Sequence, residues 1–399
     1  MTAPCPPTYD AVVIGAGPAG SATAARLAQA GFDVLLLDRA RFPRPKPCAE
    51  YVSPGAVEAL HRLGALRPIL EEGPARLSGM RVVGPDGGGF TGRFLRGWGL
   101  GVPRERLDLH IAAAAQRAGA QLLQGVTFES LAPAQGGVWV RVRVRSGDSS
   151  IGLRARVVIG ADGLNSRVAH QFGLARRSGP TRAALVAHAL GVAGMGDVGE
   201  MHVGAAGYAG LAPLGDGITN VAVVVDLARD GIRAPVSAAF QEQLAQFPSL
   251  RGRLDDVETI SPVRAVGPFG RTTRRASAER ALLVGDAADF YDPFTGEGVY
   301  AALQGAELAA ACAAGALGRD RLGARHLAWY DRTRREAFAA KWTLERIVSW
   351  VISRPGALRH VAARLARRPE LADLLVSVTA HAAPPSRVFR PSYVWRLVN

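Results

Sequence analysis

The stretch from Val12 to Gly20, which reads VVIGAGPAG, decides the fold of this chain. The apolar run before it, Tyr9 to Ile14, predicts a buried strand, and the alanine-rich run after it, Ser21 to Ala30, predicts a helix. Phe32 to Leu37 predicts a second strand, which ends at Asp38. A glycine turn between a strand and a helix, with an acidic residue closing the next strand, is typical of a dinucleotide-binding βαβ unit.

Each glycine of this turn has its own task. Gly15 permits the sharp bend, Gly17 lets the backbone approach a phosphate, and Gly20 allows close packing of the helix. The helix N-terminus then faces the negative charge of a pyrophosphate. Asp38 is placed to accept hydrogen bonds from a ribose diol. The cofactor contacts predicted in this part of the chain are Gly15, Gly17, Ala19, Gly20, Asp38 and Arg39.

A second glycine-bearing segment lies far along the chain, where Leu283 to Gly298 reads LVGDAADFYDPFTGEG. Asp286 can hold ribityl hydroxyls, and the helix expected from Val299 can stabilise negative charge on a flavin pyrimidine ring. A third turn, Ala161-Asp162-Gly163, follows another apolar run at Ala155 to Gly160. The contacts predicted in these two turns are Asp162, Gly285, Asp286, Pro293, Gly296 and Gly298. Together the segments indicate a bound flavin rather than a freely exchanging nucleotide.

In this order, the three motifs resemble those of the FAD-dependent oxidoreductase superfamily that contains the aromatic hydroxylases, the flavin halogenases and the geranylgeranyl reductases. The resemblance covers nearly the whole chain. It implies an α/β fold, with a Rossmann-like FAD-binding domain, an interleaved β-sheet substrate domain and a helical C-terminal region. It also implies that Arg104, just before the predicted helix at Leu107 to Ala118, faces the cofactor. An ordinary arginine at a helix N-terminus is the alternative interpretation.

One segment is similar to the geranylgeranyl reductase branch in particular. Arg41 to Glu50 reads RFPRPKPCAE and looks like the Pro-Arg-x-Lys-x-Cys-Gly segment that lies beside the flavin ring in that branch. The cofactor contacts that this resemblance implies are Arg44, Lys46 and Cys48. The chain departs from the branch in two places. Ala49-Glu50 replaces glycines, and Gly207 to Pro213 lacks the tryptophan typical of the reductases.

The domain boundaries follow from these motifs and from the change of sequence texture between them. The β-like runs between residues 181 and 263 predict a separate sheet on the substrate side. The predicted domains are residues 1–180 for FAD binding, with part of the substrate sheet around 76–103, then 181–263 for the substrate sheet, 264–320 for a return to the FAD-binding domain and 321–399 for the helical C-terminal region. The proline-punctuated tail after Ala382 is expected to lie over the surface.

Composition narrows the classes of function. The chain has 399 residues, of which 48% are hydrophobic, so a substantial core is expected. The three cysteines, Cys5, Cys48 and Cys312, lack metal-ligand spacing, so neither a disulfide framework nor a metal site is expected, and a cytoplasmic location fits best. No integral membrane span and no nucleic-acid partner are expected, although the net charge is +14. The arginines between Arg354 and Arg368 could let a surface helix touch lipid or an anionic partner, with a solvated helical face as the alternative.

The leading functional hypothesis is an FAD-dependent monooxygenase. It would use dioxygen and a flavin C4a-hydroperoxide to hydroxylate a small apolar substrate, phenolic or polyketide-derived, as in natural product biosynthesis. The alternative is a geranylgeranyl reductase-like flavoprotein that reduces isoprenoid or other alkene bonds. A hypothesis of another class is a non-catalytic flavoprotein, or a redox partner that acts on a substrate bound to a carrier protein.

The catalytic side chains stay open at this point. The candidates are His188, His202, Tyr208, Cys48 and Glu50. A histidine in the substrate sheet could polarise a phenol or act as a base, whereas a lone histidine is more often structural. No second glycine-rich nucleotide turn is present, so electrons are expected from NAD(P)H or from another external donor such as a reductase protein.

Overall fold

A largely parallel sheet is built on the glycine-rich stretch. The computed structural model describes residues 7–144, 149–179, 181–205, 207–228, 235–255 and 257–398, so Cys5 lies outside the described part. The strand order is β20-β21-β11-β1-β2-β8, and β1 pairs in parallel with both β11 and β2. These strands are β1 (Thr8–Ile14), β2 (Val34–Asp38), β8 (Gln121–Gln124), β11 (Ser150–Gly160), β20 (Ser277–Ala278) and β21 (Ala281–Leu283). Because the sheet is covered on its faces, its central strands β1 and β11 end in runs of buried apolar residues.

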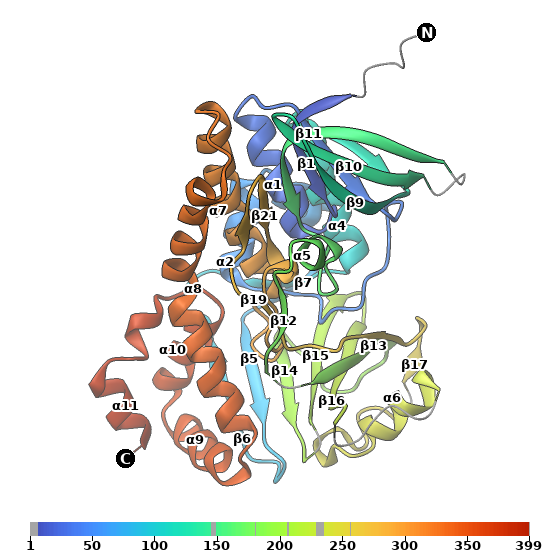
Figure 1. The fold of residues 1–399 in the computed structure, drawn as a ribbon. Helices are drawn as coiled ribbons and strands as arrows, with labels where there is room; N and C mark the ends of the chain where they lie inside the picture. The colour runs from blue at the N-terminus through green and yellow to red at the C-terminus, as the bar shows by residue number, and fades with distance from the viewer. Residues whose placement is uncertain are drawn as a thin grey trace.

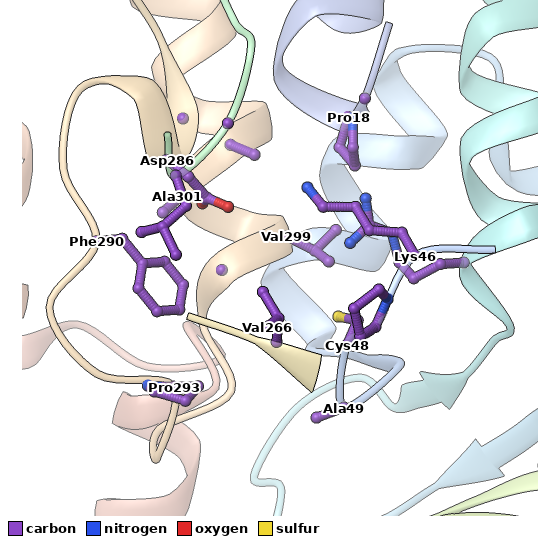
Figure 2. Close-up of a pocket in the computed structure, with 18 of the residues that line it drawn as sticks. Pro18, Lys46, Cys48, Ala49, Val266, Asp286, Phe290, Pro293, Val299 and Ala301 are labelled. Atoms are coloured by element: carbon purple, nitrogen blue, oxygen red, sulfur yellow. The ribbon is translucent and has the colours of Figure 1, made fainter. Parts of the chain in front are cut away.

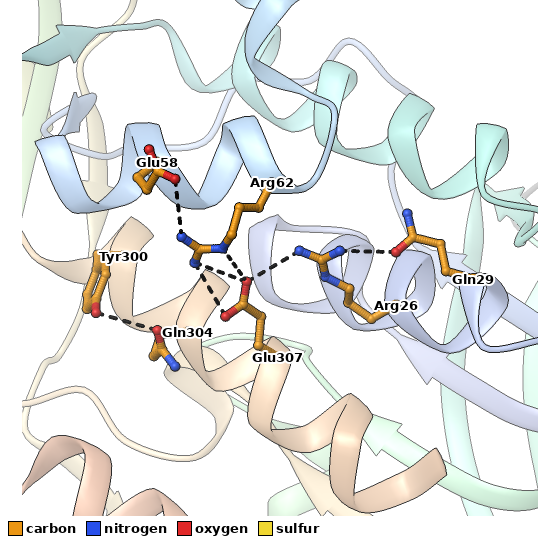
Figure 3. Close-up of polar contacts among 7 residues, drawn as sticks. All are labelled: Arg26, Gln29, Glu58, Arg62, Tyr300, Gln304 and Glu307. Atoms are coloured by element: carbon orange, nitrogen blue, oxygen red, sulfur yellow. Dashed lines mark hydrogen bonds and ion pairs between the residues drawn. The ribbon is translucent and has the colours of Figure 1, made fainter.

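Helices from distant parts of the chain pack together beside this sheet. Helix α1 (Pro18–Gln29) lies against α4 (Arg104–Arg117) and α7 (Gly298–Gly318). Figure 3 shows how a surface carboxylate ties three helices: Glu307 of α7 accepts hydrogen bonds from Arg26 of α1 and from Arg62 of α2 (Pro54–Arg62). The short α3 (Leu66–Glu71) and α5 (Arg167–Gln171) and the antiparallel hairpin of β9 (Val126–Ala134) and β10 (Gly137–Val144) complete this part.

The second large sheet lies below the first in Figure 1. Its order is β17-β13-β16-β15-β14-β5-β6, with β18 beside β13. Two of its strands, β5 and β6, come from much earlier in the chain than the others, and β5 pairs in parallel with β14. The strands are β5 (Gly79–Val83), β6 (Gly89–Arg93), β13 (Arg182–Leu190), β14 (Val198–Val203), β15 (Gly207–Gly215), β16 (Ile218–Asp226), β17 (Glu258–Thr259) and β18 (Arg264–Val266).

Alternation along these strands separates two buried faces. Leu185 and Val223 pack with Phe240 of α6 (Val236–Leu244) on one face. Val186 and Val224, one residue further along their strands, point to the opposite face, which is turned toward the FAD-binding part. The substrate sheet is therefore buried on both sides, and its second face is free to wall a cavity.

Small elements link the two sheets. A three-stranded sheet has the order β3-β7-β4, and a two-stranded one pairs β12 with β19. Their bounds are β3 (Tyr51–Val52), β4 (Ala75–Leu77), β7 (Gly99–Gly101), β12 (Ala175–Arg177) and β19 (Arg271–Thr273), and 3-10 turns cover Pro248–Leu250, Gly285–Ala287 and Pro385–Arg387.

The C-terminal region is a helical lobe at the left of Figure 1. Its helices are α8 (Ala324–Ile352), α9 (Pro355–Arg367), α10 (Pro369–Thr379) and α11 (Pro391–Val398). A proline opens each of α9, α10 and α11, where its missing N–H costs nothing. The tail differs from the expectation of a surface segment, because Val388 and Tyr393 are buried in the core of this lobe. Among the described helices, α7 alone has the length and apolar composition of a membrane span, and 56% of that window is buried inside the fold.

Candidate FAD and substrate site

One cavity of about 980 Å³ runs from the glycine turn to the substrate sheet. It lies beyond the carboxyl ends of β1, β11 and β21, where open α/β sheets place their ligands. Figure 2 shows Asp286 and Cys48 directing their side chains into it from opposite sides. The walls come from all parts of the chain, so the folded arrangement creates the site.

The turn at the start of α1 accepts glycine alone at two positions. Gly15 has φ +102°, and a Cβ on Gly20 would lie 1.8 Å from the Gly15 carbonyl oxygen. A Cβ on Gly17 would meet only the end of the Arg44 side chain, at 3.9 Å, so the Gly17 backbone faces open space. No side chain caps α1, whose first N–H groups are available to an anion.

Asp38 braces this turn from the end of β2. Its Oδ2 accepts a hydrogen bond from the Ala16 N–H at 2.8 Å, and its Oδ1 accepts one from the Ala40 N–H at 2.8 Å. Both oxygens keep a lone pair. Asp38 and Arg39 line the cavity, and the predicted ribose contact stays a prediction.

Several buried polar atoms at the cavity lack a partner among the described residues. Asp162 Oδ2 accepts from the N–H groups of Arg167 and Val168, while its Oδ1 has no hydrogen bond. Burial raises the pKa of Asp162. Tyr51 Oη, on another residue that lines the cavity, is likewise buried without a partner. Unsatisfied groups of this kind facing a cavity fit the hydroxyls, carbonyls and ring nitrogens of FAD.

The start of α7 forms the far end of the cavity. A Cβ on Gly298 would meet no atom within 4 Å, and no side chain caps the helix, so its first N–H groups can face negative charge on a flavin ring. Glu297 is buried beside them, and its Oε2 lies 3.4 Å from Lys341 Nζ. Burial raises the pKa of Glu297 to about 8; Lys341 opposes this shift and Glu345 adds to it.

The loop that resembles the reductases carries a buried charge network. Asp108 is fully buried and takes two bonds of 2.9 Å from Arg104 and an ion pair of 3.1 Å from Arg44. Burial would lower the pKa of Arg104, but the charge of Asp108 and the neighbouring Cys48 side chain raise it. Burial lowers the pKa of Lys46, and the charges of Arg104 and Arg44 act in the same direction. Two arginines and a lysine thus surround one carboxylate at the cavity wall.

Glu50 fixes this loop from behind. It is a buried residue in the left-handed region, with φ +56°. Its Oε1 accepts from the Arg104 N–H at 2.8 Å, and its Oε2 accepts from Asn220 Nδ2 at 3.0 Å and lies 2.6 Å from His188 Nε2. Asn220 also donates to the Cys48 carbonyl oxygen at 2.9 Å. The hydrogen bond with Glu50 raises the pKa of His188, against the effect of burial.

The five catalytic candidates therefore lie in three places. Cys48 and Tyr208 line the large cavity, and Glu50 and His188 line a smaller one of about 30 Å³ behind the loop. His202 lines neither; its Nε2 lies 2.9 Å from Glu200 and its Nδ1 lies 2.8 Å from Ser249.

The hydroxyl of Tyr208 is already engaged. It donates to Asp292 Oδ1 at 2.7 Å, and Arg182 donates to Asp292 Oδ2 at 2.8 Å. Burial and the neighbouring Asp292 raise the pKa of Tyr208 well above its ordinary value. The phenol therefore stays neutral and holds its proton in this bond.

Placement of the predicted cofactor residues is as follows. Those that line the large cavity are Gly15, Gly17, Ala19, Asp38, Arg39, Arg44, Lys46, Cys48, Arg104, Asp162, Gly285, Asp286, Pro293, Gly296 and Gly298. Gly20 supports the turn instead, by packing on Gly15. Residues that the sequence analysis did not single out are Asp108, Asn220, Arg182, Asp292 and Lys341. Most of these residues contact a partner that is distant in sequence. Asp108 is the exception, because its spacing of four residues from Arg104 predicts an ion pair on one helix face.

Comparison with known proteins agrees with this geometry. The profile of the FAD binding domain family matches residues 8–343. The chain belongs to this family. It is an FAD-dependent oxidoreductase, and the residues just described fit the cofactor.

Relatives of this flavoprotein include two reductases. It is 31% identical over 342 residues to digeranylgeranylglycerophospholipid reductase 1 of Methanothermobacter thermautotrophicus, covering 82% of each chain. It is 32% identical over 317 residues to menaquinone reductase of Mycobacterium tuberculosis, covering 75% of each chain. A flavoprotein/dehydrogenase of Cytophaga hutchinsonii has the same fold, with a TM-score of 0.83, 21% identity, and coverage of 94% of this chain and 92% of the other. The reductase relatives support the alternative hypothesis better than the monooxygenase.

Proposed function

We propose that this flavoprotein is a reductase that saturates carbon–carbon double bonds of an isoprenoid lipid or a similar apolar alkene. The observation that carries the proposal is the apolar chamber between the Lys46–Cys48 loop and the substrate sheet. Its lining on the sheet side includes Met80, Val186, Met201, Leu211 and Val224. The two relatives that are named as reductases support the same class of reaction.

Saturation of an alkene adds a hydride to one carbon and a proton to the other. FAD, once reduced, supplies the two electrons as a hydride. The protein must exclude water, orient the double bond and hold the proton. The two electrons would come from NAD(P)H or from a redox protein, as an external donor to the site.

Lys46 is the group best suited to hold that proton at the cavity wall. Its pKa is lowered by burial and by the two nearby arginines, so its Nζ proton is released more readily than that of an exposed lysine. Tyr208 is less suited, because its proton is held by Asp292. Asn220 donates both to the Cys48 carbonyl oxygen and to the Glu50 carboxylate, and so sets the position of the loop that carries Lys46.

The proposal is tested by anaerobic turnover. The chemically reduced holoprotein is mixed with a geranylgeranyl-bearing glycerophospholipid, and the product is analysed by mass spectrometry. A product that gains two hydrogens without dioxygen is the expected result, with oxidised holoprotein as the control. Turnover that requires dioxygen and adds one oxygen atom would overturn the proposal in favour of monooxygenation.

A further inference from the structure

The last helix of the chain shows an apolar face to solvent. Helix α11 buries Tyr393 and packs Leu397 against the core of the C-terminal lobe. At about 100° per residue, Val394, Trp395 and Val398 fall within one arc of about 100° on a different side of the helix. These three residues are 45%, 65% and 57% exposed. The helix is therefore apolar on two sides, and one of them is largely exposed.

Basic residues lie at both ends of this helix, although Arg396 of the helix itself is paired with Glu370. Residues 354–399 contain eight arginines and two acidic residues, which leaves a charge of +6. Arg387 and Arg390 are exposed just before α11, and neither forms an ion pair with a described residue. At the other end of the helix, Arg368 donates to the Arg396 carbonyl oxygen, so the α9–α10 junction adds its positive charge there.

We propose that α11 anchors the C-terminal lobe to the surface of an anionic lipid bilayer. An apolar helix face with a tryptophan, bordered by arginines, matches the interface between acyl chains and headgroups. The tryptophan ring and the aliphatic side chains would enter the bilayer surface, while the guanidinium groups meet lipid phosphates. The charge decides between a bilayer and a second copy of the chain, because two such faces would repel one another.

The location of the anchor suits an apolar substrate. Helix α8 of the same lobe contributes Phe338 and Trp342 to the wall of the large cavity. The lobe that α11 would hold at the bilayer thus also contributes part of the cavity wall. The inference does not rest on the proposed reduction, since it concerns binding to lipid and not the fate of a double bond.

Vesicle sedimentation tests the anchor on the full-length holoprotein. The vesicles are phosphatidylcholine alone, or phosphatidylcholine with phosphatidylglycerol, and contain no alkene substrate of the enzyme. We expect binding to the anionic vesicles that weakens with salt, and binding at least tenfold weaker for Val394→Ser/Trp395→Ser/Val398→Ser. Because this triple variant could lose the packing of α11, Arg387→Gln/Arg390→Gln serves as a second variant, with weaker binding expected to anionic vesicles.

Trp329→Ser is the matched control. Trp329 is 52% exposed near the start of α8, and 23 residues of helix, about 35 Å, separate it from the end of α8. This variant should bind as the unmodified protein does. Equal binding to neutral and anionic vesicles, unchanged binding of both anchor variants, or no binding at all would overturn the proposal. A dimer in light scattering that the triple variant converts to a monomer would also overturn it, by assigning the face to a second copy.

Discussion

Glu50 combines a strained backbone conformation with side-chain contacts that hold the cofactor loop. A residue other than glycine in the left-handed region costs about 1 kcal/mol, and the three contacts of the carboxylate offset this cost. We expect Glu50→Ala to lose the contacts and keep the strain, whereas Glu50→Gly loses the contacts and relieves it. In denaturant unfolding of the two holoproteins, the free energy of unfolding of Glu50→Ala should therefore be about 1 kcal/mol lower than that of Glu50→Gly. Equal stability, or the reverse order, would contradict this account of Glu50.

Single residues were predictable from the sequence where a local pattern defines their role. Lys46 and Cys48 belong to a short motif, and both line the cavity. The contact between Glu50 and His188 was not predictable, because it joins a loop to a strand 138 positions away and depends on the register of the substrate sheet. His202 could be named as a candidate from the sequence, but the structure engages both its ring nitrogens with Glu200 and Ser249, and His202 does not line the cavity.

At the scale of elements, the strand–turn–helix at Gly15 to Gly20 carries the sharpest prediction. In Gly20→Ala the new methyl would lie 1.8 Å from a backbone oxygen, and no flexible side chain is there to move. We expect loss of bound FAD, read from the flavin absorbance of the purified protein. Gly31→Ala is the control, since Gly31 has φ +85° and no neighbour within 4 Å. It should lose about 1 kcal/mol of stability and keep its FAD; a flavin content that does not distinguish the two variants would refute this role of Gly20.

The start of α7 predicts a pH dependence. The folded-state pKa of Glu297 is raised to about 8, above its ordinary value of 4.5, so the native protein binds the extra proton between these limits. Stability should then fall as pH rises through this window, and stay lower above it. Glu297→Gln should reduce the fall, measured by urea unfolding at about pH 6 and about pH 9. The control is Glu58→Gln, because Glu58 is an exposed residue of α2 and its replacement should leave the loss of stability with pH unchanged. The same loss of stability in Glu297→Gln as in the unmodified protein would contradict this prediction.

The elements themselves were predictable to different degrees. Strands β1, β2 and β11 each contain a buried apolar run near the expected residues, although β11 begins at Ser150, five residues before the expected start at Ala155. Helix α4 begins at Arg104, three residues before the expected start, because Glu50 accepts a hydrogen bond from the Arg104 N–H and extends the first turn. Helix α11 was missed, since eight residues after a proline gain their helical state from docking on the lobe.

At the scale of the whole molecule, the α/β class and the FAD-binding half followed from the sequence, because their motifs are local. Part of the second sheet was expected around residues 76–103, but its strand order and register could not follow from the sequence. Strand β5 joins β14 across more than a hundred residues, and such pairings leave no short-range signal. The shape of the cavity depends on these pairings, and so does the choice of substrate.

The positions of the lining residues along the chain also determine when, during synthesis, the cofactor site becomes complete. The turn at Gly15 rests against Ala161, the far end is formed at Gly298, and the last lining residue is Glu345 of α8. A ribosome makes these segments in that order, N-terminal first. For most of its synthesis, the nascent chain therefore lacks part of the cavity wall. The complete flavin site can form only after nearly nine-tenths of the polypeptide has been made.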